Sequence, residues 1–175
     1  GIKFEFELIS NAGNERRLQA ATIVQEQLKK VGIKVNIRTY EAAYLFTEVI
    51  PKKQFDAALI GWSVSSKVDF TPLFHSKAMR EPLNFVSYSN RRFDSLNDEA
   101  RITLDKEKAR KLWMKVHQLL AQDLPYTWLY YLVEGNGVHK RFRNVLFDNR
   151  GSFVNLEEWW IPVEERIEID WLTLN

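Results

Sequence analysis

The chain has 175 residues, which is the length of one domain or of one domain with an appendage. Apolar residues make up 45% and aromatic residues 13% of it, so the chain can bury a core and most of it is not disordered. Its 25 basic and 23 acidic residues are too balanced to indicate a nucleic-acid partner, and the absence of cysteine excludes disulfides, thiolate metal sites and a cysteine nucleophile.

The first forty residues predict a strand, a helix and a second strand. Apolar and polar side chains alternate over residues 2–9, which is typical of a strand with one wet face. Asn14 is placed to cap a helix with an apolar stripe over residues 18–31, and Gly32 ends it as a left-handed cap. Apolar and polar side chains alternate again over residues 33–37, which predicts a second strand. Because a helix connects the two strands within about 38 residues, the strands are expected to be parallel.

Further elements are predicted along the next eighty residues. A short helix is expected from residue 41 to about residue 50, where a proline follows. Residues 55–62 form an almost continuous apolar run, which indicates a buried strand. Residues 93–103 and 105–122 predict two longer helices. The second has the clearer apolar face, and Asp105 is placed to cap it. After them, residues 126–133 are strand-like.

Groups for catalysis or metal binding are sparse. The three histidines are His75, His117 and His139. None lies three or four residues from another, so structural or surface roles are favoured and no metal site is predicted. A catalytic set could be drawn from Ser63 or Ser65 with Asp69 and His75, but no glycine-flanked nucleophile elbow surrounds these serines. With no phosphate-binding glycine loop either, we predict no catalytic residue and no cofactor.

The most informative local feature is the end of the predicted strand at residues 55–62, which opens into a polar loop. Ligands of α/β sheets gather just outside the carboxyl ends of the strands. The Trp62 ring could lie against a ligand, or it could equally belong to the core. The backbone N–H groups that follow it could bind polar ligand atoms. The candidate ligand-binding residues are Trp62, Ser63, Val64, Ser65 and Asp69.

Several short segments also occur in the order of a known family. They are residues 11–16 with 27–35, residues 55–62, residues 73–76 with 84–85 and 88–90, residues 93–96 with 99–101, the long helix leading to 124–126 and 129–131, and residues 150–151 with 159–161. Through the order of these segments, the chain resembles the family 5 extracellular solute-binding proteins. These are the oligopeptide- and dipeptide-type receptors of ABC importers.

The resemblance implies an α/β fold of the periplasmic-binding-protein-like (type II) kind, with a mixed sheet flanked by helices. Family members are longer and have two lobes that close on a ligand about a hinge. The matched segments belong to their C-terminal portion, mainly one lobe. Residues 1–155 are then expected to form a ligand-binding lobe, and residues 156–175 a tryptophan-rich tail that returns toward the missing N-terminal lobe. A chain that begins inside a strand pattern without an initiator methionine fits such a piece.

The resemblance also implies a function without catalysis. Such a receptor captures a peptide or a related small solute outside the membrane and delivers it to an ABC permease. It works on the periplasmic or extracellular face of the cell membrane, where the full-length protein can carry a lipid anchor. No nucleic acid takes part.

Two departures from the family leave the ligand class open. Peptide-binding members commonly carry an aspartate three residues after the tryptophan, where it neutralises the ligand's α-amino group; this chain has Ser65 there. Many members also have a pocket tryptophan after the glutamate that precedes the second helix, and here Ala42 follows Glu41. The ligand is then a peptide whose α-amino group is bound by other residues, or another solute such as an oligosaccharide or a metal chelate.

Two functions of other classes are kept as alternatives. A small hydrolase would use a serine near His75, and its esterase activity would be lost when Ser63 or Ser65 is replaced by alanine. An interaction or scaffold domain would dock a partner through the tryptophan-rich tail, and truncation of the tail would abolish that docking.

Overall fold

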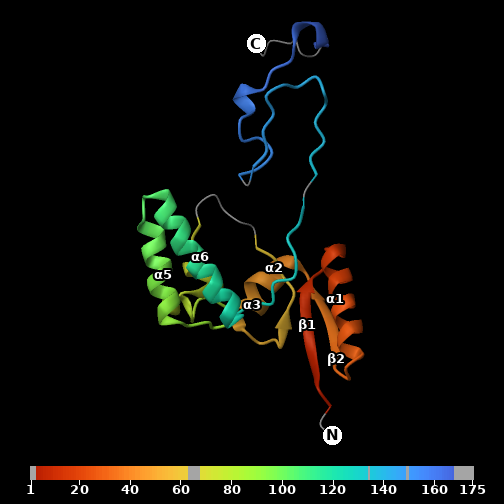
Figure 1. Cartoon of the computed structure of the whole chain (residues 1–175). Helices are drawn as coiled ribbons and strands as arrows, with labels where there is room; N and C mark the ends of the chain where they lie inside the picture. Colours follow the sequence, from red (N-terminus) through yellow and green to blue (C-terminus); the bar gives the residue numbers. More distant parts are fainter. Residues whose placement is uncertain (1–2, 63–67, 134, 149, 168–175) are drawn as a thin grey trace. The chain divides into compact units, whose positions relative to one another are not determined.

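A computed structural model of the whole chain describes residues 3–62, 68–133, 135–148 and 150–167 (Figure 1). The candidate residues Ser63, Val64 and Ser65 lie outside these ranges. The chain divides into two compact units. Unit 1 comprises residues 1–63 and 69–127, and unit 2 comprises residues 64–68 and 128–175. The expected boundary between a lobe ending at residue 155 and a tail stays a prediction.

Unit 1 is built on a parallel three-stranded sheet in the order β2-β1-β3. Its elements are β1 (Glu5–Asn11), α1 (Glu15–Lys29), β2 (Lys34–Tyr40) and β3 (Ala57–Ala58). β1 and β2 pair in register from the first residue of each strand to the last, which confirms the predicted strand–helix–strand unit. Helical segments connect β1 to β2 and β2 to β3, and β1 pairs with both other strands in parallel, where a mixed sheet was expected.

The signals predicted for α1 are confirmed. The Asn14 side chain accepts a hydrogen bond from the Arg17 backbone N–H at 3.0 Å, and Gly32 adopts a left-handed conformation (φ 82°) just beyond the helix. α1 then covers one face of the sheet, where Leu8, Ala21 and Val35 form a buried cluster. Helix capping and apolar burial therefore place the first turn of α1 beside the carboxyl end of β1.

Three short helical segments follow β2: α2 (Ala42–Tyr44), the π-helical η1 (Leu45–Val49) and α3 (Ile50–Lys52). The helix ends close to the expected position near Pro51. Pro51 lies within the first turn of α3, and the left-handed Lys53 (φ 54°) directly follows the last helical residue, Lys52. These segments supply Leu45 and Ile50 to a second buried cluster, which also contains Ile9 and Phe85.

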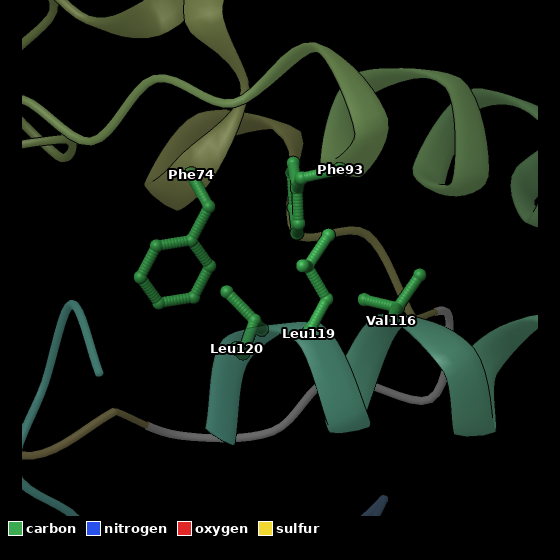
Figure 2. Close-up of a cluster of buried hydrophobic side chains, with 5 residues drawn as sticks. All are labelled: Phe74, Phe93, Val116, Leu119 and Leu120. Carbon is green, nitrogen blue, oxygen red and sulfur yellow. The ribbon is translucent and has the colours of Figure 1, made fainter. Parts of the chain in front are cut away.

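The rest of unit 1 is helical. It contains α4 (Thr71–Phe74), the 3₁₀ turn η2 (Ser76–Ala78), α5 (Arg91–Ile102) and α6 (Lys106–Asp123). As predicted, Asp105 caps α6, accepting a hydrogen bond from the Lys108 backbone N–H at 2.7 Å. The buried face of α6 meets α4 and α5 in a cluster of Phe74, Phe93, Val116, Leu119 and Leu120 (Figure 2).

Unit 2 contains only short elements in its described part: η3 (Leu156–Glu158), η4 (Val163–Glu165) and two antiparallel bridges, Arg143 with Trp160 and Asp148 with Gly151. The buried Asn155 organises it, since its side chain bonds the backbone of Asn144 and Leu146 and the Trp159 indole N–H. The strand-like run predicted at residues 126–133 forms no strand here. In the described part of the chain, no helix is long and apolar enough to cross a membrane.

Candidate functional site

The carboxyl ends of β1 and β3 lie side by side and lead directly to Trp62. Beyond the two residues of β3, the Leu59 backbone N–H still donates to the Ile9 carbonyl oxygen at 2.8 Å. The Ser10 hydroxyl donates to the Leu59 carbonyl oxygen, also at 2.8 Å. The chain therefore leaves the sheet only after residue 59, and Trp62 stands at the edge where ligands of parallel sheets bind.

The Trp62 ring packs on one neighbour and remains accessible. It stacks on Phe85 with ring centroids 6.1 Å apart and planes inclined by 19°, and Phe85 stacks in turn on Tyr126 at 5.5 Å and 14°. Trp62 nevertheless keeps 39% of its surface exposed. It is thus neither a core residue nor a loose surface residue, and an aromatic ring held in this way offers a ligand a preordered apolar surface.

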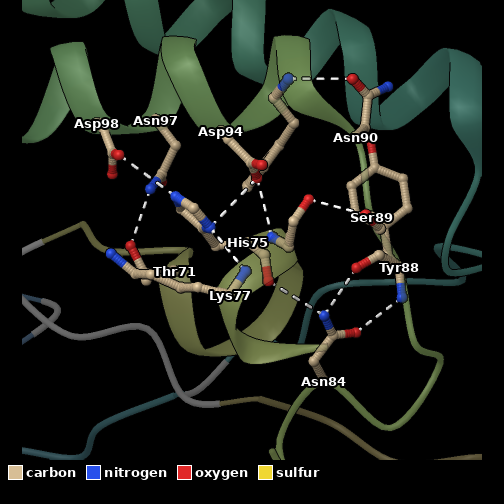
Figure 3. A network of polar contacts seen from close by, with 12 residues as sticks. Thr71, His75, Lys77, Asn84, Tyr88, Ser89, Asn90, Asp94, Asn97 and Asp98 are labelled. Carbon is tan, nitrogen blue, oxygen red and sulfur yellow. Dashed lines mark hydrogen bonds and ion pairs between the residues drawn. The ribbon is translucent and has the colours of Figure 1, made fainter. Parts of the chain in front are cut away.

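The Phe85 ring is positioned by two polar side chains. The Lys53 ammonium donates to the carbonyl oxygens of Met79 and Asn84, at 2.7 and 2.8 Å. The fully buried Asn84 side chain accepts from the Tyr88 backbone N–H and donates to the Tyr88 carbonyl oxygen, both at 2.9 Å (Figure 3). Because an unsatisfied buried amide or ammonium is costly, these bonds fix the backbone on either side of Phe85.

The Tyr126 hydroxyl is buried beside the stacked rings of the site. Burial raises the pKa of Tyr126, and the Trp62 side chain opposes this only in part. An unfolded tyrosine loses its proton near pH 10, at which the folded one still holds it. The raised pKa therefore contributes stability below pH 10 that is lost as the pH rises further.

We expect the free energy of unfolding to fall between pH 8 and pH 11, and Tyr126→Phe to reduce that fall, since phenylalanine keeps the ring and has no proton to lose. Urea unfolding at the two pH values measures the effect. Tyr131→Phe, at a position that is 87% exposed, is the control and should leave the fall unchanged. An equal fall in Tyr126→Phe and the wild type would contradict the burial of this hydroxyl.

Asp69, the other described candidate, faces the α5 helix. One carboxylate oxygen accepts the Thr71 backbone N–H at 2.9 Å, and the other lies 3.1 Å from the Arg101 guanidinium. The carboxylate thus ties the end of the loop to α5 and starts α4. Its predicted contact with a ligand stays a prediction, and any such contact has to compete with Arg101.

His75 has other partners than a serine hydrolase would need. Its buried ring lies between the carboxylates of Asp94 and Asp98, 3.3 Å from each (Figure 3). Its Nδ1 also lies 3.1 Å from the Lys77 backbone N–H, which donates to it. Asp69, the carboxylate expected to orient this histidine in a hydrolase, is bonded to Arg101 instead, so the geometry does not favour that alternative.

The predicted set of ligand-binding residues stays a prediction, and the structure adds two aromatic residues beside Trp62. The structure brings Trp62 together with Phe85 and Tyr126, which were not predicted as site residues, although residues 84–85 and 124–126 belong to the segments that carry the family resemblance. In the described ranges, no group of three or more histidine, aspartate or glutamate side chains could hold a metal ion.

Comparisons with known proteins identify relatives of this chain. Residues 1–79 match the family described as bacterial extracellular solute-binding proteins, family 5 middle. The oligopeptide-binding protein AppA of Bacillus subtilis (strain 168) is 35% identical over 162 residues, which are 92% of this chain and 30% of that protein. Glutathione-binding protein GsiB of Escherichia coli (strain K12) is 28% identical over 75% of this chain and 27% of its own length.

Solved structures agree with the sequence comparisons. AppA from Bacillus subtilis in complex with a nonapeptide superposes with a TM-score of 0.74 and 34% identity, covering 93% of this chain and 32% of that chain. The oligopeptide-binding protein from Thermus thermophilus complexed with a pentapeptide gives a TM-score of 0.64 and 25% identity, covering 71% of this chain and 23% of that chain. The predicted periplasmic-binding-protein-like α/β fold is thus confirmed. The chain spans about a quarter to a third of the length of these relatives.

Proposed function

Because the chain belongs to the bacterial extracellular solute-binding proteins of family 5, we propose that it is a ligand-binding lobe of an ABC-importer receptor. It captures a peptide or a related small solute and delivers it, with the N-terminal lobe of the same polypeptide, to a membrane permease. The receptor works at the periplasmic or extracellular face of the membrane and catalyses no reaction. The chain contributes the C-terminal portion of this receptor.

The accessible Trp62 ring is the observation that carries this proposal. It stands at the carboxyl edge of a parallel sheet, on a support of two stacked rings, which is suited to binding a ligand and not to chemistry on it. The names of the similar proteins, which bind oligopeptides, a nonapeptide and a pentapeptide, favour a peptide as the ligand. Trp62 is the central contact, and the proposed set also includes Ser63, Val64, Ser65 and Asp69.

Replacing Trp62 by alanine in the full-length receptor is expected to weaken peptide binding about tenfold or more, because truncating a central aromatic contact commonly costs roughly 1–2 kcal/mol or more. Isothermal calorimetry with a library of di- to nonapeptides measures the loss. Trp62→Phe retains a ring on Phe85 and should recover part of the affinity.

Phe4→Ala is the matched control for this experiment. Phe4 is also an exposed aromatic residue, but it precedes β1 at the opposite, amino end of the sheet. It should leave the affinity unchanged. Equal affinities in the wild type and Trp62→Ala would remove this edge of the sheet from the binding site.

A further inference from the structure

Arg17 places a guanidinium group at the same edge of the sheet as Trp62. It lies in the first turn of α1, but its side chain turns back toward the end of β1. There its Nη1 donates a hydrogen bond to the side-chain oxygen of Asn11, the last residue of β1, at 2.6 Å. The bond to Asn11 holds a positive charge beside the carboxyl end of the central strand.

Gly61, the residue before Trp62, makes room for this guanidinium. A Cβ atom at Gly61 would lie 2.9 Å from Arg17 Nη2 and 3.7 Å from Arg17 Cζ. A contact of 2.9 Å is shorter than a carbon atom tolerates, so any larger residue would push the guanidinium away. Arg17 therefore lies against the backbone that leads directly into Trp62, at the carboxyl edge of the sheet.

The charge of Arg17 is not balanced by a carboxylate in the described part of the chain. Its side chain bonds the neutral amide of Asn11, whereas Arg38 and Arg101 in the same unit each pair with acidic residues. A guanidinium has five N–H donors arranged as a planar fork that fits a carboxylate with two parallel hydrogen bonds. A single bond to Asn11 leaves this capacity unused, at a half-buried position where an added anion would be bound strongly.

We propose that Arg17 binds a carboxylate group of the ligand beside Trp62. The inference rests on the proposed function and deepens it, since it assigns the ligand a chemical class: a peptide or other solute whose carboxylate lies next to an apolar group that can cover the indole ring. Two acids of unit 1 already have partners: Asp69 pairs with Arg101, and Glu41, which follows β2, accepts the Tyr44 backbone N–H. Asn11 and Gly61 act as positioning residues for the guanidinium.

The test uses the full-length receptor and pairs of peptides that differ only in one carboxylate. Each pair has a free or an amidated C-terminus, or a glutamate in place of a glutamine. The wild type is expected to prefer the acid in at least one kind of pair by roughly 10- to 100-fold in dissociation constant, as for one charged hydrogen-bonded contact. Calorimetry with both peptides of a pair gives the ratio of their dissociation constants. A general loss of fold would weaken the binding of both peptides and leave this ratio unchanged.

Three variants complete the experiment. Arg17→Met should abolish the preference for the acid while the amide binds as before. Gly61→Ala should reduce the preference too, because its Cβ meets only the flexible end of the Arg17 side chain and displaces it without breaking the fold. Arg16→Met removes the same charge from the neighbouring exposed position of α1 and should keep the preference.

The outcomes separate the two proposals. A wild-type receptor that binds none of the peptides contradicts the proposed function and the inference with it. A receptor that binds peptides but does not distinguish acid from amide, or in which Arg17→Met keeps the distinction, overturns the role of Arg17 and leaves the proposed function standing.

Discussion

Replacing Phe74 by alanine is expected to lower the free energy of unfolding of unit 1 by about 3–5 kcal/mol, the usual cost of removing a buried phenylalanine ring. Phe74 is only 1% exposed and lies at the centre of the cluster between α4, α5 and α6 (Figure 2). Its ring contacts those of Tyr88, Phe93 and Tyr126, with centroids 5.9, 6.0 and 4.9 Å away. Alanine would leave a cavity that three rigid rings cannot fill by a small shift.

Urea unfolding of the wild type and the variant measures this cost. Phe74→Leu should recover more than half of the loss, because leucine refills most of the volume. Leu104→Ala, at a position that is 96% exposed, should change stability by less than about 0.5 kcal/mol. A cost below about 1 kcal/mol for Phe74→Ala would show that the helices do not share this core.

The same variant also connects the core to the site. Tyr126 packs against Phe74 on one side and stacks with Phe85 on another, and Phe85 supports Trp62. A cavity at Phe74 should therefore loosen the support of the Trp62 ring. If the variant still folds, its tryptophan fluorescence should respond less to peptide than that of the wild type.

Much of unit 1 could be predicted because its signals are local. The Asn14 and Asp105 caps, the left-handed Gly32 and the alternation over the first strand each act within a few residues, and each is found where expected. The predicted strand at residues 55–62 is present, but only Ala57–Ala58 form a ladder with β1. An apolar run indicates burial, whereas the length of a strand depends on how far its neighbour runs beside it.

The site was harder to predict because its parts come from distant segments. The polar loop and Trp62 could be identified from the order of residues along one strand. The stacking of Trp62 on Phe85, the bonds of Lys53 across more than twenty residues and the approach of Arg17 to Gly61 all depend on tertiary contacts. A glycine and an arginine in separate motifs carry no sign of their contact in a single sequence.

The isolated 175-residue chain is expected to bind no peptide tightly. In the proposed receptor two lobes enclose the ligand, and this chain corresponds to about a third of the length of its relatives. If half of a roughly −8 kcal/mol interaction is lost with the other lobe, a micromolar ligand becomes about millimolar. Polar contacts such as that proposed for Arg17 should suffer most, because an open lobe leaves them in water, where charge interactions are weak.

Calorimetry of the isolated chain with the di- to nonapeptide library tests this expectation, with the full-length receptor under the same conditions as the reference. Urea unfolding of the isolated chain must first show a cooperative transition, so that weak binding cannot be attributed to an unfolded sample. The full-length receptor should then bind its best peptide about a thousandfold more tightly than the isolated chain. A dissociation constant below about 10 μM for the isolated chain would show that one lobe supplies most of the binding energy, and that Trp62 and its neighbours need no second lobe to hold a peptide.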